Sequence, residues 1–184
     1  LADALSGADR LAVLINNMLD ISRIESNTIR IELEEIDIGS ILKKVRNDFL
    51  QTVKRRGLTL NLVLPPKLPK IFSDSSRLYQ ILNNLLSNAL KFTPKEGLIT
   101  ISAQPEGDMV KVSVKDNGIG ILPKDKDKLF KRFPQIETSI VSEPEGSGLG
   151  LHLVKQLVEK LGGKVWAEGT LNGGAIFYFS LPEN

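Results

Sequence analysis

The chain has 184 residues, of which 41% are hydrophobic and 25% charged, values typical of one globular domain with a small appendage. It contains no cysteine, which excludes disulfides, thiolate metal sites and cysteine nucleophiles. The net charge of +2 is too small to favour nucleic acid as a partner, and no run of 18 apolar residues predicts a membrane span.

The first predicted element is a helix over residues 1–26. Its apolar positions step by three, four and three residues: Leu11, Leu14, Met18 and Ile21. Such a seam packs either on another helix or on the chain's own domain, and periodicity does not decide between the two. Beyond it, the alternation of Ile29, Ile31 and Leu33 with polar residues predicts a strand.

The rest of the chain alternates between helical and strand patterns. Asp37 is expected to cap a helix that runs to about Arg56, and Asp74 one over about 75–90. A further helix is predicted over 149–161, and strands over 58–64, 98–103, 109–114, 165–168 and 175–181. Residues 115–145 show little periodicity apart from a short helical patch near Leu129. From residue 29 onward the order predicts an α+β fold, a sheet covered on one face by helices.

The helix after Asp74 carries a polar face beside its apolar stripe. Asn84, Asn88 and Lys91 recur at i, i+4 and i+7 and so share that face. Carboxamide oxygens suit Mg²⁺, which keeps several waters and needs few protein ligands, and the ammonium suits a phosphate. By spacing alone, the same residues also fit an ordinary solvated face.

A second signal is Asp-Asn-Gly-Ile-Gly at 116–120, directly after a predicted strand. The two glycines allow a tight turn and close approach of the backbone to a ligand. The carboxylate of Asp116 can accept a hydrogen bond from an exocyclic amine such as that of adenine. Taken alone, the pattern is also that of a common turn.

A third signal is Gly-Ser-Gly-Leu-Gly-Leu at 146–151, which opens a helix. Glycines there leave backbone N–H groups free to face a phosphate at the positive helix end. The pattern does not match the dinucleotide fingerprint, because position 151 is Leu and no strand precedes the motif. A Walker loop is absent as well. The long segment between the second and third signals is typical of a functional loop, and we interpret it as a lid over a nucleotide.

In this order the motifs resemble those of sensor histidine kinases, whose Bergerat ATP-binding fold is shared with gyrase, heat-shock and mismatch-repair ATPases. Residues 77–93 resemble the asparagine box, 116–120 the first glycine box, 129–133 the phenylalanine box and 146–151 the second glycine box. The resemblance implies an α+β two-layer sandwich, a mixed β-sheet covered on one face by about three α-helices and preceded by one long N-terminal helix.

The resemblance also implies a role for each motif residue. Asn88 would ligate Mg²⁺, Asn84 and Lys91 would act at the phosphates, and Arg132 would meet the terminal phosphate. Asp116 would recognise the adenine amino group, helped by Gly120. The full set of implied ATP-binding residues is Asn84, Asn88, Lys91, Phe92, Asp116, Gly118, Ile119, Gly120, Ile121, Gly146, Ser147, Gly148, Leu149, Gly150 and Leu151. Asn84, Lys91 and Arg132 would be the catalytic members.

Residues 19–25 look like the end of the second helix of the dimerisation hairpin. The resemblance therefore divides the chain into a hairpin helix at 1–27 and an ATP-binding catalytic domain at 28–184. The phosphoacceptor histidine is expected outside this chain, because the one histidine, His152, lies in the helix after the second glycine box and fits a helix-face or core role. Ala175 stands where the family usually has Ser or Thr, which removes one expected contact toward the adenine.

The implied function is transfer of the γ-phosphate of ATP, with Mg²⁺, to a histidine on the hairpin of the same kinase. Related ATPases activate water with a Glu where this chain has Asn84, which has no basicity, so hydrolysis is poorly supported. The implied partners are that hairpin, a response regulator and a second copy in the full-length protein. The expected location is the cytoplasm, with a parent protein that is anchored to a membrane or free of it.

Two alternatives remain open at this point. One is a serine-directed kinase or anti-sigma factor of the same fold, which the hairpin-like helix disfavours. The other is an interaction module that binds no nucleotide, which the intact Asn88, Asp116 and glycine boxes disfavour.

Overall fold

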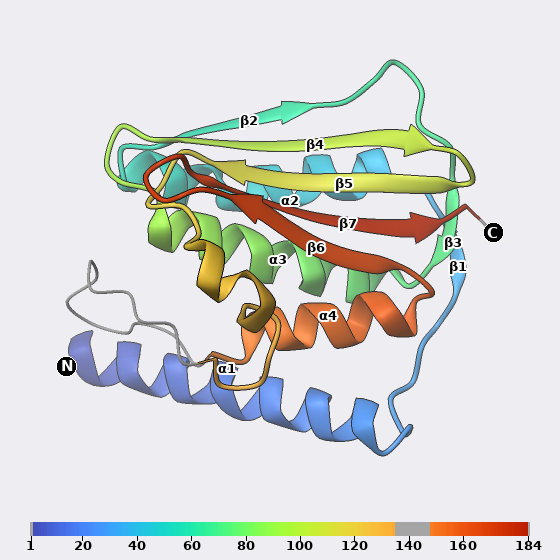
Figure 1. The fold of residues 1–184 in the computed structure, drawn as a ribbon. Helices are drawn as coiled ribbons and strands as arrows, with labels where there is room; N and C mark the ends of the chain where they lie inside the picture. Colours follow the sequence, from blue (N-terminus) through green and yellow to red (C-terminus); the bar gives the residue numbers. More distant parts are fainter. Residues whose placement is uncertain (1, 135–147, 184) are drawn as a thin grey trace.

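A computed structural model describes residues 2–134 and 148–183. Its main element is a five-stranded sheet in the order β2-β4-β5-β7-β6 (Figure 1). The strands are β2 (Thr59–Val63), β4 (Leu98–Glu106), β5 (Met109–Asp116), β6 (Lys164–Gly169) and β7 (Ala175–Pro182). Strand β2 pairs with β4 in parallel, and all other pairs are antiparallel. The sheet is therefore mixed, as the family resemblance implies.

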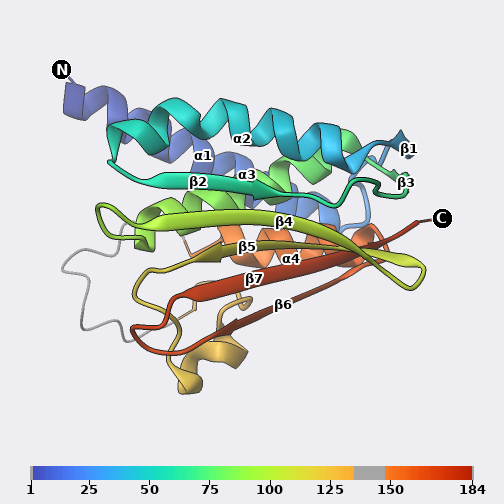
Figure 2. The same cartoon turned by 90° about the horizontal axis from the view of Figure 1, so that it is seen from above.

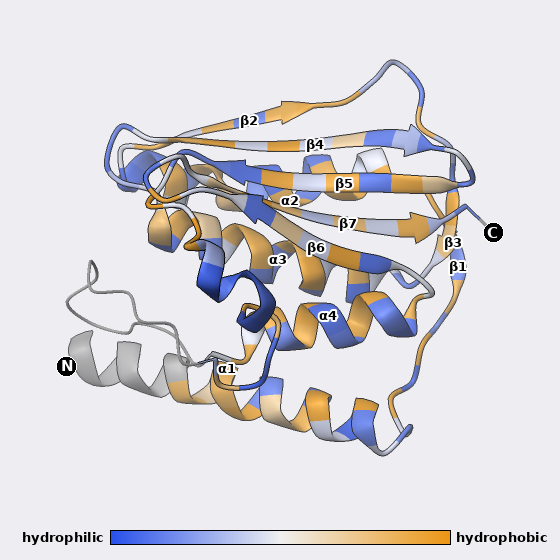
Figure 3. Cartoon of the chain, in the orientation of Figure 1, coloured by the Kyte–Doolittle hydropathy of each residue, from blue (hydrophilic) through white to orange (hydrophobic). Residues whose placement is uncertain are grey.

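Three helices cover one face of this sheet: α2 (Ile38–Arg55), α3 (Ser75–Phe92) and α4 (Gly150–Lys160) (Figures 1 and 2). Each carries an apolar stripe because its aliphatic residues recur at helical spacing. In α3 this stripe includes Leu78, Ile81, Leu82 and Leu85, all with no exposed surface. Along β5, apolar and polar residues alternate (Figure 3), so Val110, Val112 and Val114 face the helices. The core lies between the sheet and these helices.

Helix α1 (Ala2–Glu25) packs against α4 on the side away from the sheet (Figure 1). Ile21 and Ile24 are buried in the same apolar cluster as the sheet and its helices. Leu11 and Met18 of the predicted seam are exposed, while Leu14 is partly buried against the core. The C-terminal half of α1 thus uses part of its seam on the chain's own domain.

Most predicted elements are confirmed to within a few residues, but the strand predicted at 29–33 is wrong. After α1 the chain turns at Asn27, whose φ is +59°, and the N–H groups of Thr28 and Ile29 bond to the carbonyl of Arg23. Ile29 is buried by packing on the core and not by strand pairing. An alternation of apolar and polar residues indicates which side chains are buried, but a strand also needs a neighbouring strand to pair with.

A small second sheet joins β1 (Glu34–Ile36) to β3 (Ile71–Ser73) in antiparallel register. Neither three-residue strand is long enough to show a period in the sequence, and neither was predicted. The helical patch expected near Leu129 is a 3₁₀ helix, η1, at Pro123–Lys128, directly before that residue. No helix within the described residues is long and apolar enough to cross a membrane.

Candidate functional site

The polar face of α3 lies near its C-terminal end. Asn84, Asn88 and Lys91 are all partly buried there, next to the fully buried stripe. The Asn84 Nδ2 donates to the Gln80 carbonyl at 2.9 Å, which leaves its Oδ1 directed away from the helix backbone. The Lys91 Nζ lies 4.8 Å from the centre of the Phe92 ring. The helix therefore presents two carboxamides, an ammonium and an aromatic ring at one end.

Asp116 ends β5 and is 3% exposed. Its Oδ1 accepts from the N–H of Gly118 at 2.8 Å and from the N–H of Ala175 at 3.4 Å. Burial raises the pKa of this carboxyl, and the two backbone hydrogen bonds oppose that rise. Because Oδ1 is engaged, Oδ2 is the oxygen available to accept a hydrogen bond from a ligand.

The glycines after Asp116 allow three segments to meet closely. A Cβ on Gly118 would lie 2.2 Å from the Phe92 carbonyl oxygen at the end of α3. Gly120 has a φ of +78°, and a Cβ there would lie 1.8 Å from the carbonyl oxygen of Thr170 in the β6–β7 turn. The Ile119 N–H also donates to the Phe92 carbonyl at 3.3 Å. Only glycine fits at these two positions, so the first glycine motif is required for packing as well as for any ligand.

The start of α4 approaches the same region. A Cβ on Gly150 would lie 2.9 Å from the Asn84 Oδ1, so the second glycine motif contacts the polar face of α3. The residue before the helix, Leu149, makes no side-chain cap, and its side chain is fully buried. A ligand there would meet backbone N–H groups of the first turn, not the Leu149 side chain. Gly146 and Ser147 lie outside the described residues.

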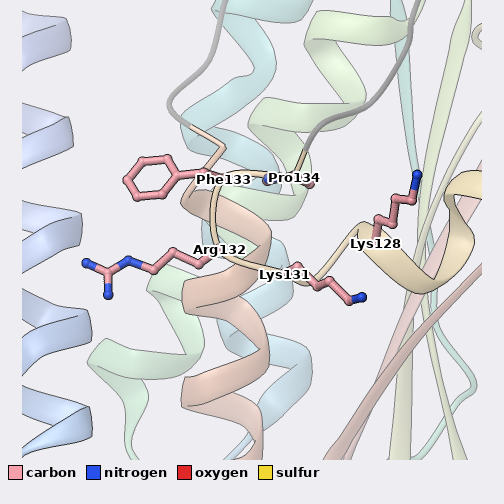
Figure 4. Close-up of a pocket in the computed structure, with 5 residues that line it drawn as sticks. All are labelled: Lys128, Lys131, Arg132, Phe133 and Pro134. Atoms are coloured by element: carbon pink, nitrogen blue, oxygen red, sulfur yellow. The ribbon is translucent and has the colours of Figure 1, made fainter.

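The segment that follows η1 carries the predicted Arg132. Its Nη1 lies 3.6 Å from the Glu25 Oε1 at the end of α1, and its guanidinium is 5.7 Å from the Phe133 ring centre. Figure 4 shows Arg132 and Phe133 pointing toward α1, while Lys128 and Lys131 point the opposite way. These four residues and Pro134 line a hollow of about 260 Å³. In this arrangement Arg132 is paired with α1.

The structure thus brings together residues from distant parts of the sequence: Asn84 with Gly150, and Phe92 with Gly118 and Asp116. Ile121 is buried instead in the core, against Gly169. The β6–β7 turn, residues 170–174, also contributes to this region, although only the next residue, Ala175, was expected near the adenine. The one signal for it was the Asn-Gly-Gly sequence between two strands, which is typical of a tight turn.

Residues 73–184 match the family described as histidine kinase-, DNA gyrase B-, and HSP90-like ATPase, and the chain belongs to this family. Within it, the chain is a homologue of the catalytic ATPase domain of the sensor histidine kinases of two-component systems. The fold and the class expected from the motifs are therefore confirmed.

Among curated proteins, the circadian input-output histidine kinase CikA of Synechococcus elongatus is 39% identical over 95% of this chain and 24% of its own length. Among solved structures, full-length ShkA in complex with AMPPNP superimposes with a TM-score of 0.85 at 31% identity, over 96% of this chain and 36% of that one. Histidine kinase ThkA in complex with response regulator TrrA shares the fold, with a TM-score of 0.78 at 23% identity, over 98% of this chain and 49% of that one. The chain spans 22% and 24% of the length of two of the curated relatives it matches, and only 10% of a third.

Proposed function

We propose that this chain binds ATP with Mg²⁺ and transfers the γ-phosphate to a histidine on the dimerisation hairpin of the same kinase. The observation that carries the proposal is the position of Asp116, a buried carboxylate at the point where the end of α3 and the glycine turn meet. Asp carboxylates are rarely buried unless they are paired, and a buried carboxyl with a perturbed pKa at the meeting point of several segments is a candidate functional group. The kinship with histidine kinase catalytic domains, and a related structure that holds an ATP analogue, support the same conclusion.

The adenine would be recognised at Asp116. Its Oδ2 can accept from the exocyclic amino group, while the bond from Gly118 holds the carboxylate in place. Phe92, at the end of α3, would line the pocket with its ring. Gly120 has no side chain, so the turn after Asp116 can pack directly on the Thr170 carbonyl beside this pocket.

The phosphates would lie between α3 and the start of α4. The Asn88 carboxamide is partly buried on the polar face of α3, and a neutral oxygen of this kind fits Mg²⁺. Described residues contain no cluster of three or more His, Asp or Glu side chains, so Asn88 and phosphate oxygens would hold the ion. A bound Mg²⁺ would neutralise phosphate charge, while Asn84, Lys91 and the backbone at Gly148–Gly150 orient the triphosphate.

Transfer to histidine is favoured over hydrolysis because Asn84 has no basicity to activate water. An imidazole needs no such base, since its ring nitrogen is itself the nucleophile. Arg132 would meet the terminal phosphate once its pair with Glu25 opens, a pair whose two side chains are about half exposed and therefore weakly bound.

The partners follow from the same proposal: a phosphoacceptor hairpin, a second copy of the kinase and a response regulator. The last is supported by the related ThkA, which was crystallised with one. The cytoplasmic location stays a prediction.

Two measurements test the proposed function. Titration calorimetry with ATP, with and without Mg²⁺, is expected to show binding that the metal strengthens. Incubation with radioactive ATP and a separately supplied acceptor hairpin is expected to label the hairpin with acid-labile phosphate and to leave this chain unlabelled. A folded chain with no affinity for adenine nucleotides would refute the proposal. Acid-labile label on this chain would show that His152 is itself a phosphoacceptor.

A further inference from the structure

His152 is the one histidine of the chain, and the nucleotide site proposed above does not use it. It lies in the first turn of α4, two residues after Gly150, and is partly buried. Its Nδ1 is 3.0 Å from the carbonyl oxygen of Phe130, in the segment that follows η1. This side chain thus joins the start of α4 to a segment 22 residues earlier in the chain.

The chemistry of this contact decides which ring nitrogen carries the proton. A backbone carbonyl only accepts hydrogen bonds, so the nitrogen that faces it must be the donor. His152 is therefore protonated on Nδ1, and in its neutral form the lone pair is on Nε2. We propose that His152 is a positioning residue whose Nδ1–H holds the Phe130 backbone, and with it the basic segment Lys128–Pro134, against the first turn of α4.

Phe130 is also held through its side chain. Its ring packs edge-on against that of Phe177 in β7, with ring centres 6.4 Å apart and planes at 82°. The preceding Leu129 is 7% exposed and belongs to the core cluster. The ring and the preceding residue therefore fix the base of the segment to the sheet, and the His152 bond fixes its backbone to α4.

A second contact lies four residues before His152, at Gly148, which precedes α4. A Cβ on Gly148 would lie 3.2 Å from the Cδ of Pro134 and 3.4 Å from the Cα of Phe133. Phe133 has a φ of +49°, a conformation that a bulky residue adopts only when its surroundings impose it. The basic segment is thus joined to the start of α4 at two points, Phe130 by His152 and Phe133–Pro134 by Gly148.

Such a joint has a consequence for a phosphate ligand. Lys131 and Arg132 lie between the two contact points, Lys128 lies two residues before the first, and all three line one hollow. The role of His152 in nucleotide binding rests on the proposed function. His152 keeps these three cations beside the start of α4, where the triphosphate would bind. Loss of one neutral hydrogen bond is expected to weaken ATP binding about two- to twelve-fold. Adenosine has no phosphate, so its affinity should change by less than about two-fold.

The proton position is tested first, on the untagged chain without nucleotide. With one histidine, the ¹⁵N and ¹³C NMR signals of the ring belong to His152 alone. Signals of the Nδ1–H tautomer are expected. Signals of the Nε2–H tautomer, which free histidine prefers, would overturn the inference, whatever the chain binds.

Three variants then test the role. In His152→Asn the side-chain amide nitrogen takes the place of Nδ1 and can donate to the Phe130 carbonyl. In His152→Gln the amide nitrogen takes the place of Nε2, and His152→Ala has no donor. Calorimetry is expected to show ATP affinity lowered in His152→Ala and His152→Gln but restored toward wild type in His152→Asn, with adenosine affinity nearly constant in all. Thermal unfolding of the three variants checks that each is folded.

Equal affinities in the Asn and Gln variants would overturn the positioning role, and so would a parallel loss for ATP and adenosine, which indicates a general structural effect. A wild-type chain that binds no adenine nucleotide would refute the proposed function and the binding role with it. The tautomer measurement would still decide the His152–Phe130 contact on its own.

Discussion

At the scale of single residues, Asp116 shows how burial and hydrogen bonding prepare a carboxylate for a ligand. Burial raises its pKa because the charged form loses water, while the N–H groups of Gly118 and Ala175 stabilise the charge in part. The charged carboxylate therefore lowers the stability of the folded chain. A ligand amine that donates to Oδ2 would supply the missing stabilisation.

Asp116→Asn is expected to weaken ATP binding about 10- to 100-fold, because an amide N–H would face the adenine amine where an acceptor is needed. Calorimetry measures the change, with the exposed Asp108→Asn as the matched control. An affinity close to that of wild type would remove Asp116 from the adenine site.

The same variant has an opposite effect on stability. The folded-state pKa of Asp116 is raised above 3.8. The contribution of this carboxyl to the free energy of unfolding is therefore favourable at low pH and is lost as the pH rises through the raised pKa. Relative to wild type, Asp116→Asn should therefore gain stability over that rise, because the amide does not titrate. Urea unfolding at a series of pH values checks this, and a difference that does not vary with pH would contradict it.

Asn88→Ala is expected to abolish the strengthening of ATP binding by Mg²⁺, because it removes the proposed metal ligand. Calorimetry with and without the metal measures it. The exposed neighbour Asn83 provides the control, since Asn83→Ala should keep the response to Mg²⁺. A full response in Asn88→Ala would show that the ion is held elsewhere.

At the scale of elements, α3 is fixed at both ends, which keeps its polar face in place. At its start, the Asp74 carboxylate accepts from the N–H groups of Ser76, Arg77 and Glu32. At its end, the Arg56 guanidinium donates to the Leu90 carbonyl at 2.8 Å. Burial acts to raise the pKa of Asp74, but its hydrogen bonds together outweigh burial and lower it.

Asp74→Ala should lower the free energy of unfolding by about 2–3 kcal/mol, because it removes a buried carboxylate that accepts from three N–H groups and leaves all three without this acceptor. Asp37→Ala, at the more exposed cap of α2, should cost about 1 kcal/mol. The pKa of Asp74 is lowered from its ordinary value of 3.8. Its contribution to the free energy of unfolding is therefore present above pH 3.8 and is lost as the pH falls through the lowered pKa. Urea unfolding at neutral and acid pH measures both effects, and equal losses in the two variants would contradict the argument from burial.

At the scale of the whole molecule, α1 is packed as part of the catalytic unit. Ile21 and Ile24 enter the common core, and the Asp20 carboxylate accepts from the Gln80 side chain at 2.7 Å and faces Arg77 at 3.7 Å. These side chains join α1 to the helix that carries Asn84 and Asn88. The division into 1–27 and 28–184 stays a prediction, and this packing makes it testable.

Ile21→Ala should lower the free energy of unfolding by about 2–4 kcal/mol through the cavity it leaves in the shared core. Met18→Ala, three residues earlier and exposed, should change it by less than about 0.5 kcal/mol. Urea unfolding of the whole chain checks both. If Ile21→Ala leaves the stability unchanged, α1 does not pack on the catalytic unit in solution.

From local sequence patterns alone, the helices α2, α3 and α4, the positions of the main strands along the chain and the three motifs of the site could be predicted. This was possible because caps, helical periodicity and strand alternation are encoded within a few neighbouring residues. The order of the asparagine, glycine and phenylalanine boxes also indicated the family, although each motif is weak alone.

Only the tertiary structure decided what those motifs touch. The contact of Gly150 with Asn84, the bond from His152 to Phe130 and the pairing of β1 with β3 join residues far apart in the chain. The same holds for α1. The spacing of its apolar residues fits packing either on another helix or on the chain's own domain, and the position of Ile21 in the core decides for the chain's own domain. Such contacts depend on the path of the whole backbone, because close packing selects one arrangement among the many that local patterns allow.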